Sequence, residues 1–296
     1  MPSAAEDRSA LVAGATGLVG RPLLPLLRDR GFAVLALSRR PAPAAGGCPS
    51  TRWAVLDLDR PGVLPGRFGC LFHAAPIWLL PRWLPQAADA GVRRLVAVSS
   101  TSRFTKRGSR SARERATADR IAGAEAAVEA GCRERGIRFT ILRPTLVYGG
   151  GRDRNVSDIA RFVRRFGFFP IAGEGRGRRQ PVRAADLAKA ALAVLDNPAT
   201  FDRAYETPGG ETVTYAEMVT RITLGVGRTP RLLHVSLPLV RAALALAGRL
   251  PGLGHVTPDM ADRMDEDLVF DAGAARRDFG YDPSAFRFPD GPDGAP

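Results

Sequence analysis

The spacing of three glycines near the start of the chain is the feature that most limits its fold. Residues 11–20 read Leu-Val-Ala-Gly-Ala-Thr-Gly-Leu-Val-Gly, and the apolar residues before the first glycine are typical of the end of a buried parallel strand. Leucines in 23–27 then supply the apolar face of a helix. A tight strand-to-helix turn alone would explain this pattern. Its place between a strand and a helix favours a loop that binds a dinucleotide.

Each glycine has its own expected task. Gly14 takes a backbone conformation that a side chain would forbid. Gly17 lets a pyrophosphate approach the main chain, and Gly20 lets the helix pack closely on its strand. The helix N-terminus then offers N–H groups and a positive dipole end to the phosphates. Because strand and helix segments alternate after this turn, the sequence predicts an α/β fold with a Rossmann-type, doubly wound parallel sheet.

The end of the second predicted strand indicates which dinucleotide binds. Residues 31–37 are apolar and end at Ser38, Arg39 and Arg40. An acidic residue at this place would hold the ribose 2′-hydroxyl of NAD, whereas arginine accommodates the 2′-phosphate of NADP. We therefore expect NADP(H), with NAD(H) as the alternative. The competing interpretation is that the two arginines are merely solvated.

Three later strands also end in residues that suit a ligand site. The third leads to Asp57, which either accepts hydrogen bonds from an adenine amino group or simply ends the strand at the surface. The fourth runs into His73, which we expect to be packed and hydrogen-bonded rather than catalytic. The fifth ends in the hydroxyl cluster 99–102, on the side where open α/β sheets bind ligands.

The chain is strongly basic. Its formal net charge of +13 comes from 43 basic residues, of which only Lys106 and Lys189 are lysines. Such a charge attracts phosphates, anionic lipid head groups and nucleic acid without specificity. We expect no specific nucleic-acid function, because no base-reading helix or stacking-aromatic motif accompanies the charge.

The cysteines, the histidines and the apolar segments of the sequence indicate where the protein is located and what it can bind. The three cysteines show no paired spacing, which is typical of a protein in a reducing cytoplasm. Neither they nor the three histidines have the spacing of metal ligands, so we expect no metal site. Residues 1–8 do not resemble a signal peptide, and no apolar run reaches the ~20 residues of a membrane span. The apolar segment 237–250 forms either a weak membrane-surface contact or, more commonly, a packed helix. We expect a monomer or a homodimer.

The ordered motifs resemble the extended short-chain dehydrogenase/reductase superfamily, in its NAD-dependent epimerase/dehydratase branch. The matching segments are 14–20, Asp57-Leu58, His73-Ala74-Ala75, Ser99-Ser100-Thr101, 143–149 and 179–186. The resemblance implies a dinucleotide-binding Rossmann core at 8–149. It also implies a small, mostly helical substrate-binding part at 150–290, interleaved with the last core elements at about 180–208.

The resemblance also implies roles for individual residues. Cofactor contacts fall on Gly14, Thr16, Gly17, Leu18, Val19, Gly20, Ser38, Arg39, Arg40, Asp57, Leu58, His73, Ala74, Ala75, Ser99 and Pro144. Substrate contacts fall on Arg143, Arg152, Asn155 and Arg179. Arg179 matches the arginine that binds a substrate diphosphate, since a planar guanidinium can bond two oxygens at once. The expected substrate is therefore an anionic small molecule similar to a nucleotide sugar.

One departure from the family pattern concerns catalysis. The family carries a Tyr-x-x-x-Lys pair that would fall near Thr117 and Ile121, yet no tyrosine precedes Tyr148. The remaining candidates for catalysis are the hydroxyls of Thr101 and Ser100 and an arginine within 103–115 that would stabilise an oxyanion. His73 is the nearby side chain whose unperturbed pKa suits proton transfer, and Tyr148 is the nearest phenol in sequence.

Two functions fit these observations. The first is an NADP(H)-binding oxidoreductase or epimerase that acts on a nucleotide-sugar-like or other anionic molecule. The second is a catalytically silent dinucleotide-binding regulator or assembly subunit, which the absent Tyr and Lys favour. The segments around Arg143 and Arg179 favour retained small-molecule binding, and hence the first.

Overall fold

The computed structural model describes residues 8–39, 50–60, 62–249 and 257–288, and these form two compact units. Unit 1 contains the described residues up to Pro144 together with Ala184–Thr207 and Asp271–Asp282. Unit 2 contains Thr145–Arg183 and the described residues of Pro208–Phe270 and from Pro283 onward. The polypeptide therefore passes between the units several times.

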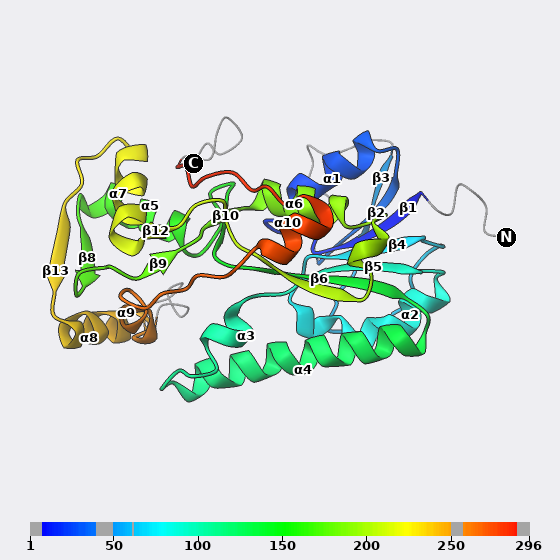
Figure 1. Cartoon of the computed structure of the whole chain (residues 1–296), viewed down its shortest axis with the longest axis horizontal. Coiled ribbons are helices and arrows are strands. Elements are labelled where there is room, and N and C mark those ends of the chain that lie inside the picture. The colour runs from blue at the N-terminus through cyan, green and yellow to red at the C-terminus, as the bar shows by residue number, and fades with distance from the viewer. Residues whose placement is uncertain (1–7, 40–49, 61, 250–256, 289–296) are drawn as a thin grey trace. The chain divides into compact units, whose positions relative to one another are not determined.

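Unit 1 is built on a parallel sheet of seven strands, in the order β11-β6-β5-β4-β1-β2-β3 (Figure 1). The strands are β1 Ser9–Ala13, β2 Ala33–Ser38, β3 Thr51–Val55, β4 Cys70–His73, β5 Arg94–Val98, β6 Arg138–Pro144 and β11 Arg203–Thr207. The strand order reverses between β1 and β4, and in open α/β sheets ligands bind at such a reversal, outside the carboxyl ends of the strands. The predicted doubly wound α/β fold is confirmed.

Helices cover both faces of this sheet (Figure 1). On one face lie α1 Gly20–Asp29, α6 Ala184–Ala193 and α10 Gly273–Phe279; on the other lie α2 Leu84–Asp89 and α4 Ala112–Glu134. The short helix α3 Ser102–Thr105 precedes α4. Single 3-10 turns occupy Ile77–Leu79, Pro81–Trp83 and Pro198–Thr200. Ile121 and Val128 of α4 pack with Leu84, Leu95 and Phe139 in one buried cluster, which fixes α4 against the sheet.

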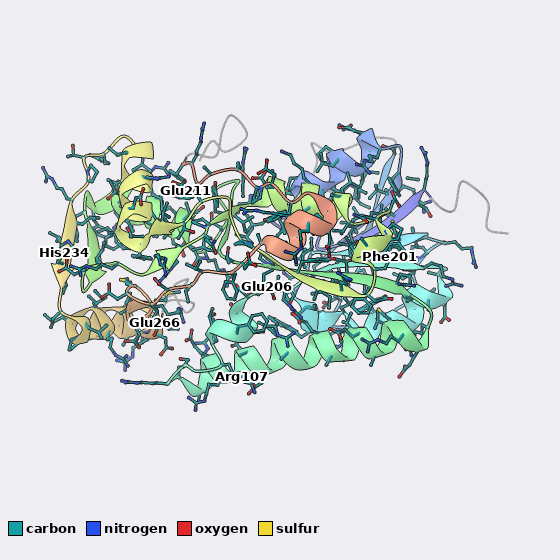
Figure 2. All side chains as sticks on the ribbon, viewed as in Figure 1. Arg107, Phe201, Glu206, Glu211, His234 and Glu266 are labelled. Atoms are coloured by element: carbon teal, nitrogen blue, oxygen red, sulfur yellow. The ribbon has the colours of Figure 1, made fainter. Side chains whose placement is uncertain are left out.

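Arg94 holds a distant segment of the chain on the sheet. This residue begins β5 and is buried, yet its guanidinium donates to the carbonyls of Leu195 and Val194 at 2.8 and 2.7 Å. It also donates to the Thr140 hydroxyl at 2.6 Å and lies 4.6 Å from the Phe201 ring centroid (Figure 2 labels Phe201). Because these bonds replace water around a buried charge, they tie the segment after α6 to β5 and β6.

Unit 2 combines helices with short strand pairs. Its helices are α5 Val156–Phe166, α7 Tyr215–Gly225, α8 Leu237–Ala247 and α9 Asp259–Asp262. Its ladders pair β7 Val147–Tyr148 with β10 Val182–Arg183, β8 Phe169–Ala172 with β13 Leu232–Val235, and β9 Arg178–Arg179 with β12 Val213–Thr214. None of the helices within the described ranges is long and apolar enough to cross a membrane.

Helix α7 has a side-chain cap, since the Thr214 hydroxyl accepts the Glu217 N–H at 3.1 Å. The chain stays packed after α10, because Tyr281 and Phe286 are buried. Residues 289–296 and Leu250 lie outside the described ranges. The short strands were not expected, since pairs of two to four residues leave little periodicity.

Candidate functional site

The glycine loop after β1 lies directly against the main chain that follows β4. Gly14 has φ of 77°, and a Cβ there would lie 2.6 Å from the carbonyl carbon of Ala74 and 2.7 Å from the nitrogen of Ala75. A Cβ on Gly20 would lie 2.2 Å from the Gly14 carbonyl oxygen. Both positions therefore require glycine, as the spacing predicts.

Gly17 differs from its two neighbours because its outer side is open. A Cβ there would meet only the carbonyl oxygens of Gly14 at 3.0 Å and Ala74 at 3.9 Å. The main-chain N–H groups of Leu18 and Val19 donate to no protein acceptor in the described part of the chain. Helix α1 has no acidic residue in its first turn. The loop thus offers free donors and a positive helix end, a combination that fits a diphosphate.

The other expected cofactor contacts surround this loop at the ends of β2, β3 and β4. Arg39 is exposed directly after β2, whereas Ser38 is buried and Arg40 lies outside the described residues. The exposed Asp57 carboxylate accepts the N–H of Asp59 at 3.1 Å, and the Leu58 carbonyl accepts the indole N–H of Trp83. Thr16, Ala74 and Ala75 are half-buried beside the loop.

His73 is a packed residue, as expected. It is 2% exposed, and its Nε2 lies 3.2 Å from the Pro76 carbonyl oxygen. Burial lowers its pKa to about 4, which the Pro76 contact only partly offsets. The imidazole is therefore neutral at neutral pH. Its use as a titrating acid near pH 7 is excluded by this burial.

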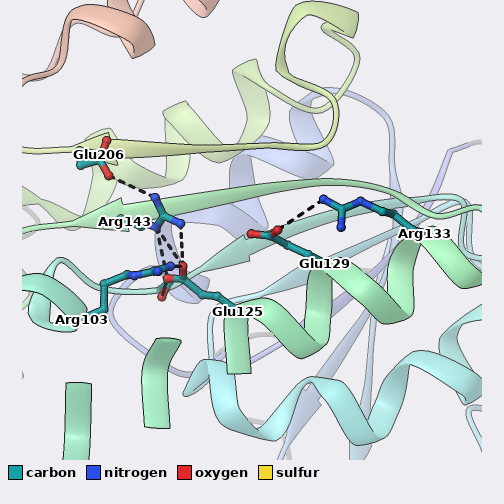
Figure 3. A network of polar contacts seen from close by, with 7 residues as sticks. Arg103, Glu125, Glu129, Arg133, Arg143 and Glu206 are labelled. Atoms are coloured by element: carbon teal, nitrogen blue, oxygen red, sulfur yellow. Dashed lines mark hydrogen bonds and ion pairs between the residues drawn. The ribbon is translucent and has the colours of Figure 1, made fainter. Parts of the chain in front are cut away.

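A buried ion cluster lies at the carboxyl ends of β5 and β6 (Figure 3). Glu125 of α4 is fully buried and forms ion pairs with Arg103 and Arg143. The Ser99 hydroxyl donates to the same carboxylate, and Arg143 Nη1 also donates to Glu206 Oε1 at 3.2 Å. We call these five residues the Glu125 cluster.

The sheet register explains part of this arrangement. Glu206 of β11 lies opposite Arg143 of β6, so the two side chains are on one face of the sheet. Arg143 donates to Glu125 Oε2 from Nε at 3.0 Å and from Nη2 at 2.7 Å. Burial opposes its charge, but the hydrogen bonds and attraction from Glu125 and then Glu206 raise its pKa. The two arginines and two glutamates balance each other's charge, which a buried site requires.

Arg103 is the cluster member that remains open to a ligand. Its side chain is 24% exposed and uses one nitrogen, Nη1, on Glu125. Its Nε and Nη2 groups donate to no acceptor among the described residues, while its guanidinium lies 5.0 Å from the Phe104 ring centroid. Glu125 therefore holds a cation beside the hydroxyl cluster with donors to spare.

The two expected catalytic hydroxyls differ in availability. Thr101 is buried and donates its hydroxyl proton to the Pro144 carbonyl at 3.1 Å. That proton is therefore not available to a substrate oxygen, which corrects the role expected for Thr101. The half-buried Ser100 hydroxyl accepts the Ser102 N–H at 3.1 Å, and its own proton reaches no acceptor within the described ranges. Ser100 is thus the better donor.

Helix α4 presents no phenol or ammonium at the expected positions. Thr117 donates its hydroxyl to the Arg113 carbonyl at 2.9 Å, and Ile121 is buried in the core. Tyr148 is buried in unit 2 and packs edge-on against Phe286, with ring centroids 5.0 Å apart. Its position in that core removes it as an alternative catalytic phenol.

The expected substrate residues are not in equivalent environments. Arg152 and Asn155 are exposed beside the start of α5, around the buried Asp153, which accepts the N–H groups of Asn155 and Ser157 at 3.0 Å. Arg179 is 5% exposed and donates to the Glu266 carbonyl at 2.5 Å. It also donates to the carbonyls of Arg178 and Arg263, and burial lowers its pKa.

These contacts restrict the substrate assignment. The guanidinium of Arg179 is occupied by main-chain acceptors, so the structure does not offer it to a diphosphate. Arg143 belongs to unit 1 and is engaged in the Glu125 cluster. Arg152 and Asn155 remain exposed. Among the described residues, no three side chains of metal-binding type lie together.

Sequence reasoning missed the pairing of Glu125, Arg103 and Glu206. One signal was present: Glu125 falls in line with Ile121 and Val128, a spacing of four and then three residues. A carboxylate on the apolar stripe of a helix must find buried partners, since an unpaired charge is unfavourable there.

The sequence and the fold of this chain are similar to those of known proteins. Residues 82–206 match the sequence model of the NAD dependent epimerase/dehydratase family. The chain is 24% identical over 208 residues to UDP-glucose 4-epimerase of Vibrio cholerae, covering 67% of this chain and 61% of that protein. The solved structure of MoeE5 in complex with UDP-glucose and NAD superimposes with a TM-score of 0.70 at 20% identity, covering 94% of each chain.

A second kind of relative matches a shorter part. The chain is 31% identical over 107 residues to the mitochondrial NADH dehydrogenase [ubiquinone] 1 alpha subcomplex subunit 9 of Arabidopsis thaliana. This alignment covers 36% of the present chain and only 26% of the plant protein's length. The resemblance to epimerases and dehydratases, and the fold it implies, are confirmed by the family match and the shared architecture.

The Glu125 cluster leads to a stability prediction. We expect Glu125→Gln to lower the free energy of unfolding by about 3 kcal/mol, because two partly buried arginines lose their shared carboxylate. Glu129→Gln is the matched control, one turn along α4, where a more exposed carboxylate pairs with Arg133 at 3.5 Å (Figure 3). We expect the control to change stability by less than about 0.5 kcal/mol.

Urea denaturation followed by circular dichroism measures both effects. Equal losses in the two variants would show that the buried cluster contributes no more than a surface pair.

Proposed function

We propose that the glycine loop of this chain binds a nicotinamide dinucleotide. The chain has the fold of the NAD-dependent epimerases and dehydratases, and residues 82–206 match that family. The open side of Gly17, together with the free N–H groups of Leu18 and Val19, is the observation that carries this proposal. NADP(H) is preferred to NAD(H), because Arg39 is exposed at the end of β2. MoeE5 and similar structures were solved with NAD, so the preference for NADP(H) rests on this chain's own residues.

The proposed activity is that of an oxidoreductase or epimerase on an anionic small molecule similar to a nucleotide sugar. The bound nicotinamide would supply or accept a hydride. Ser100 donates a hydrogen bond to the reacting oxygen, and Arg103 stabilises negative charge on it. Unit 1 carries the dinucleotide loop, Ser100 and Arg103. The exposed Arg152 and Asn155 belong to unit 2, and we propose each of them separately as a contact for an anionic group. The match to a UDP-glucose 4-epimerase supports this substrate class.

None of the side chains proposed to contact the reacting oxygen is an ordinary proton donor. Serine and arginine side chains do not titrate near neutral pH, and burial keeps His73 neutral. The proton therefore comes from water or from the substrate itself. Turnover should be slow compared with an enzyme that has an activated tyrosine.

A second function is a catalytically silent dinucleotide-binding regulator or assembly subunit. The commitment of the Thr101 proton to Pro144 and the burial of Ile121 favour it. The local match to a subunit of mitochondrial NADH dehydrogenase is consistent with it. Dinucleotide binding is common to both functions, and hydride transfer belongs only to the first.

The cofactor preference can be tested by titration. We expect NADPH to bind more tightly than NADH, and Arg39→Ala to weaken NADPH about tenfold while leaving NADH unchanged. Arg30→Ala, which removes an exposed arginine at the C-terminal end of α1, away from the glycine loop, should have no effect. Nicotinamide fluorescence measures all six affinities. Tighter NADH binding, or an unaltered preference in Arg39→Ala, would reverse the assignment.

The catalytic proposal is tested on the small molecule that copurifies with the protein, identified by mass spectrometry. We expect a nucleotide sugar or another anion, and slow hydride transfer to or from it. Ser100→Ala should lower the rate about 100-fold, and Ser102→Ala, two residues later in the same hydroxyl cluster, less than twofold. Bound dinucleotide without hydride transfer to any sugar nucleotide would favour the silent function instead.

A further inference from the structure

Two stretches of unit 2 contain no acidic residue. Residues 159–173 and 218–258 have arginine as their only charged residue type at neutral pH. The stretches meet in space, since β8 of the first pairs in parallel with β13 of the second. Part of unit 2 is therefore built from segments that carry positive charge alone.

The helix that follows β13 exposes apolar side chains on its outer side. In α8, Leu239, Ala242, Ala243 and Leu246 are all exposed, and their spacing of three, four and seven residues puts them on one face. Leu239 and Leu246 are each 64% exposed. Val240, on the inner side, is buried in a core with Ile171 and Met264 of the same unit. The helix is therefore apolar on both its inner and its outer side.

Exposed apolar side chains also occur just before this helix, in β13, and at the first residue of α8. Leu233 of β13 is 48% exposed and Leu237, at the start of α8, is 41% exposed. Figure 2 shows His234 on the same strand, and its side chain is exposed. We call the exposed side chains of residues 231–249 the β13–α8 surface. Large exposed apolar groups gathered in one segment indicate an interaction site.

Unpaired cations flank this surface. Arg231 and Arg249 stand at its two ends, are exposed and form no ion pair with any described residue. Arg241 is different, because Asp262 of α9 pairs with it. Arg228, two residues before Pro230, is also exposed and donates to the Arg164 carbonyl at 3.4 Å. The arrangement is a leucine-rich face with a positive rim.

We propose that the β13–α8 surface docks on the surface of an anionic lipid bilayer, with α8 lying in the plane of the membrane. The leucines enter the boundary between head groups and acyl chains, and the flanking arginines bind lipid phosphates. Charge complementarity favours this occupant, because an anionic head-group layer attracts the flanking arginines while the acyl boundary takes up the leucines. This inference is independent of the proposed activity, which requires no membrane.

The test measures co-sedimentation of the full chain with vesicles. We expect binding to vesicles of phosphatidylcholine with 30% phosphatidylserine and no binding to phosphatidylcholine alone. Leu239→Asp with Leu246→Asp should reduce binding at least tenfold. The control pair Val63→Asp with Leu224→Asp makes the same change in net charge at exposed apolar residues outside the surface, and should reduce it less than twofold.

Arg231→Ala with Arg249→Ala should weaken binding about tenfold, and circular dichroism confirms that each variant is folded. Equal losses in the two aspartate pairs would mean that only the overall positive charge of the chain attracts vesicles, which contradicts the proposal. Absence of vesicle binding, with a dimer in solution that Leu239→Asp and Leu246→Asp dissociate, would identify a second copy of the chain as the occupant instead.

Discussion

The close contact between Gly14 and the main chain at Ala74 and Ala75 is the constraint on which unit 1 depends. Strands β1 and β4 are neighbours where the strand order reverses, and their following loops touch with no room for a side chain. Gly20 imposes the same condition where α1 starts. Any larger residue would separate the two loops or displace the helix. Once these contacts are satisfied, Gly17 is left with an open side, which we propose as the place of the diphosphate.

The second constraint is the burial of Glu125. A buried carboxylate is unfavourable unless charge and hydrogen bonds compensate, and here Ser99, Arg103 and Arg143 do so. The result is that the loop after β5, helix α4 and strands β6 and β11 are joined at one edge of the sheet. In this chain a fixed guanidinium stands beside the hydroxyl cluster. The slow chemistry that we propose rests on this permanent cation, which cannot supply a proton near neutral pH.

Local patterns in the sequence predict much of unit 1. The glycine turn, the alternation of strands and helices, and the end of β5 just before the hydroxyl cluster 99–102 follow from residues that are close in sequence. The packing of His73 was expected because a lone histidine is more often packed than catalytic, and the side chain is 2% exposed. These features need no knowledge of distant parts of the chain, which explains why they could be predicted.

The rest depends on partners far away in sequence. Thr101 is committed to Pro144, 43 residues later, and Arg179 to the carbonyl of Glu266, 87 residues later. Neither partner has a side-chain pattern that reveals the contact, because the acceptor is a main-chain carbonyl. The sequence indicated a role for each residue, and only the folded structure shows that their donors are already in use.

The central claim is that a dinucleotide diphosphate binds at the open side of Gly17. The most direct test compares dinucleotide binding by wild type and by Gly17→Ala. A Cβ at Gly17 fits the fold with only a small adjustment at Gly14, but it occupies the open side of the loop. Gly123→Ala, where a Cβ would have no neighbour within 4 Å, is the control. The account predicts that all three proteins fold and that wild type and Gly123→Ala bind NADPH equally. Gly17→Ala should bind at least tenfold more weakly, and unchanged binding by this variant, or no binding by wild type, would contradict the account.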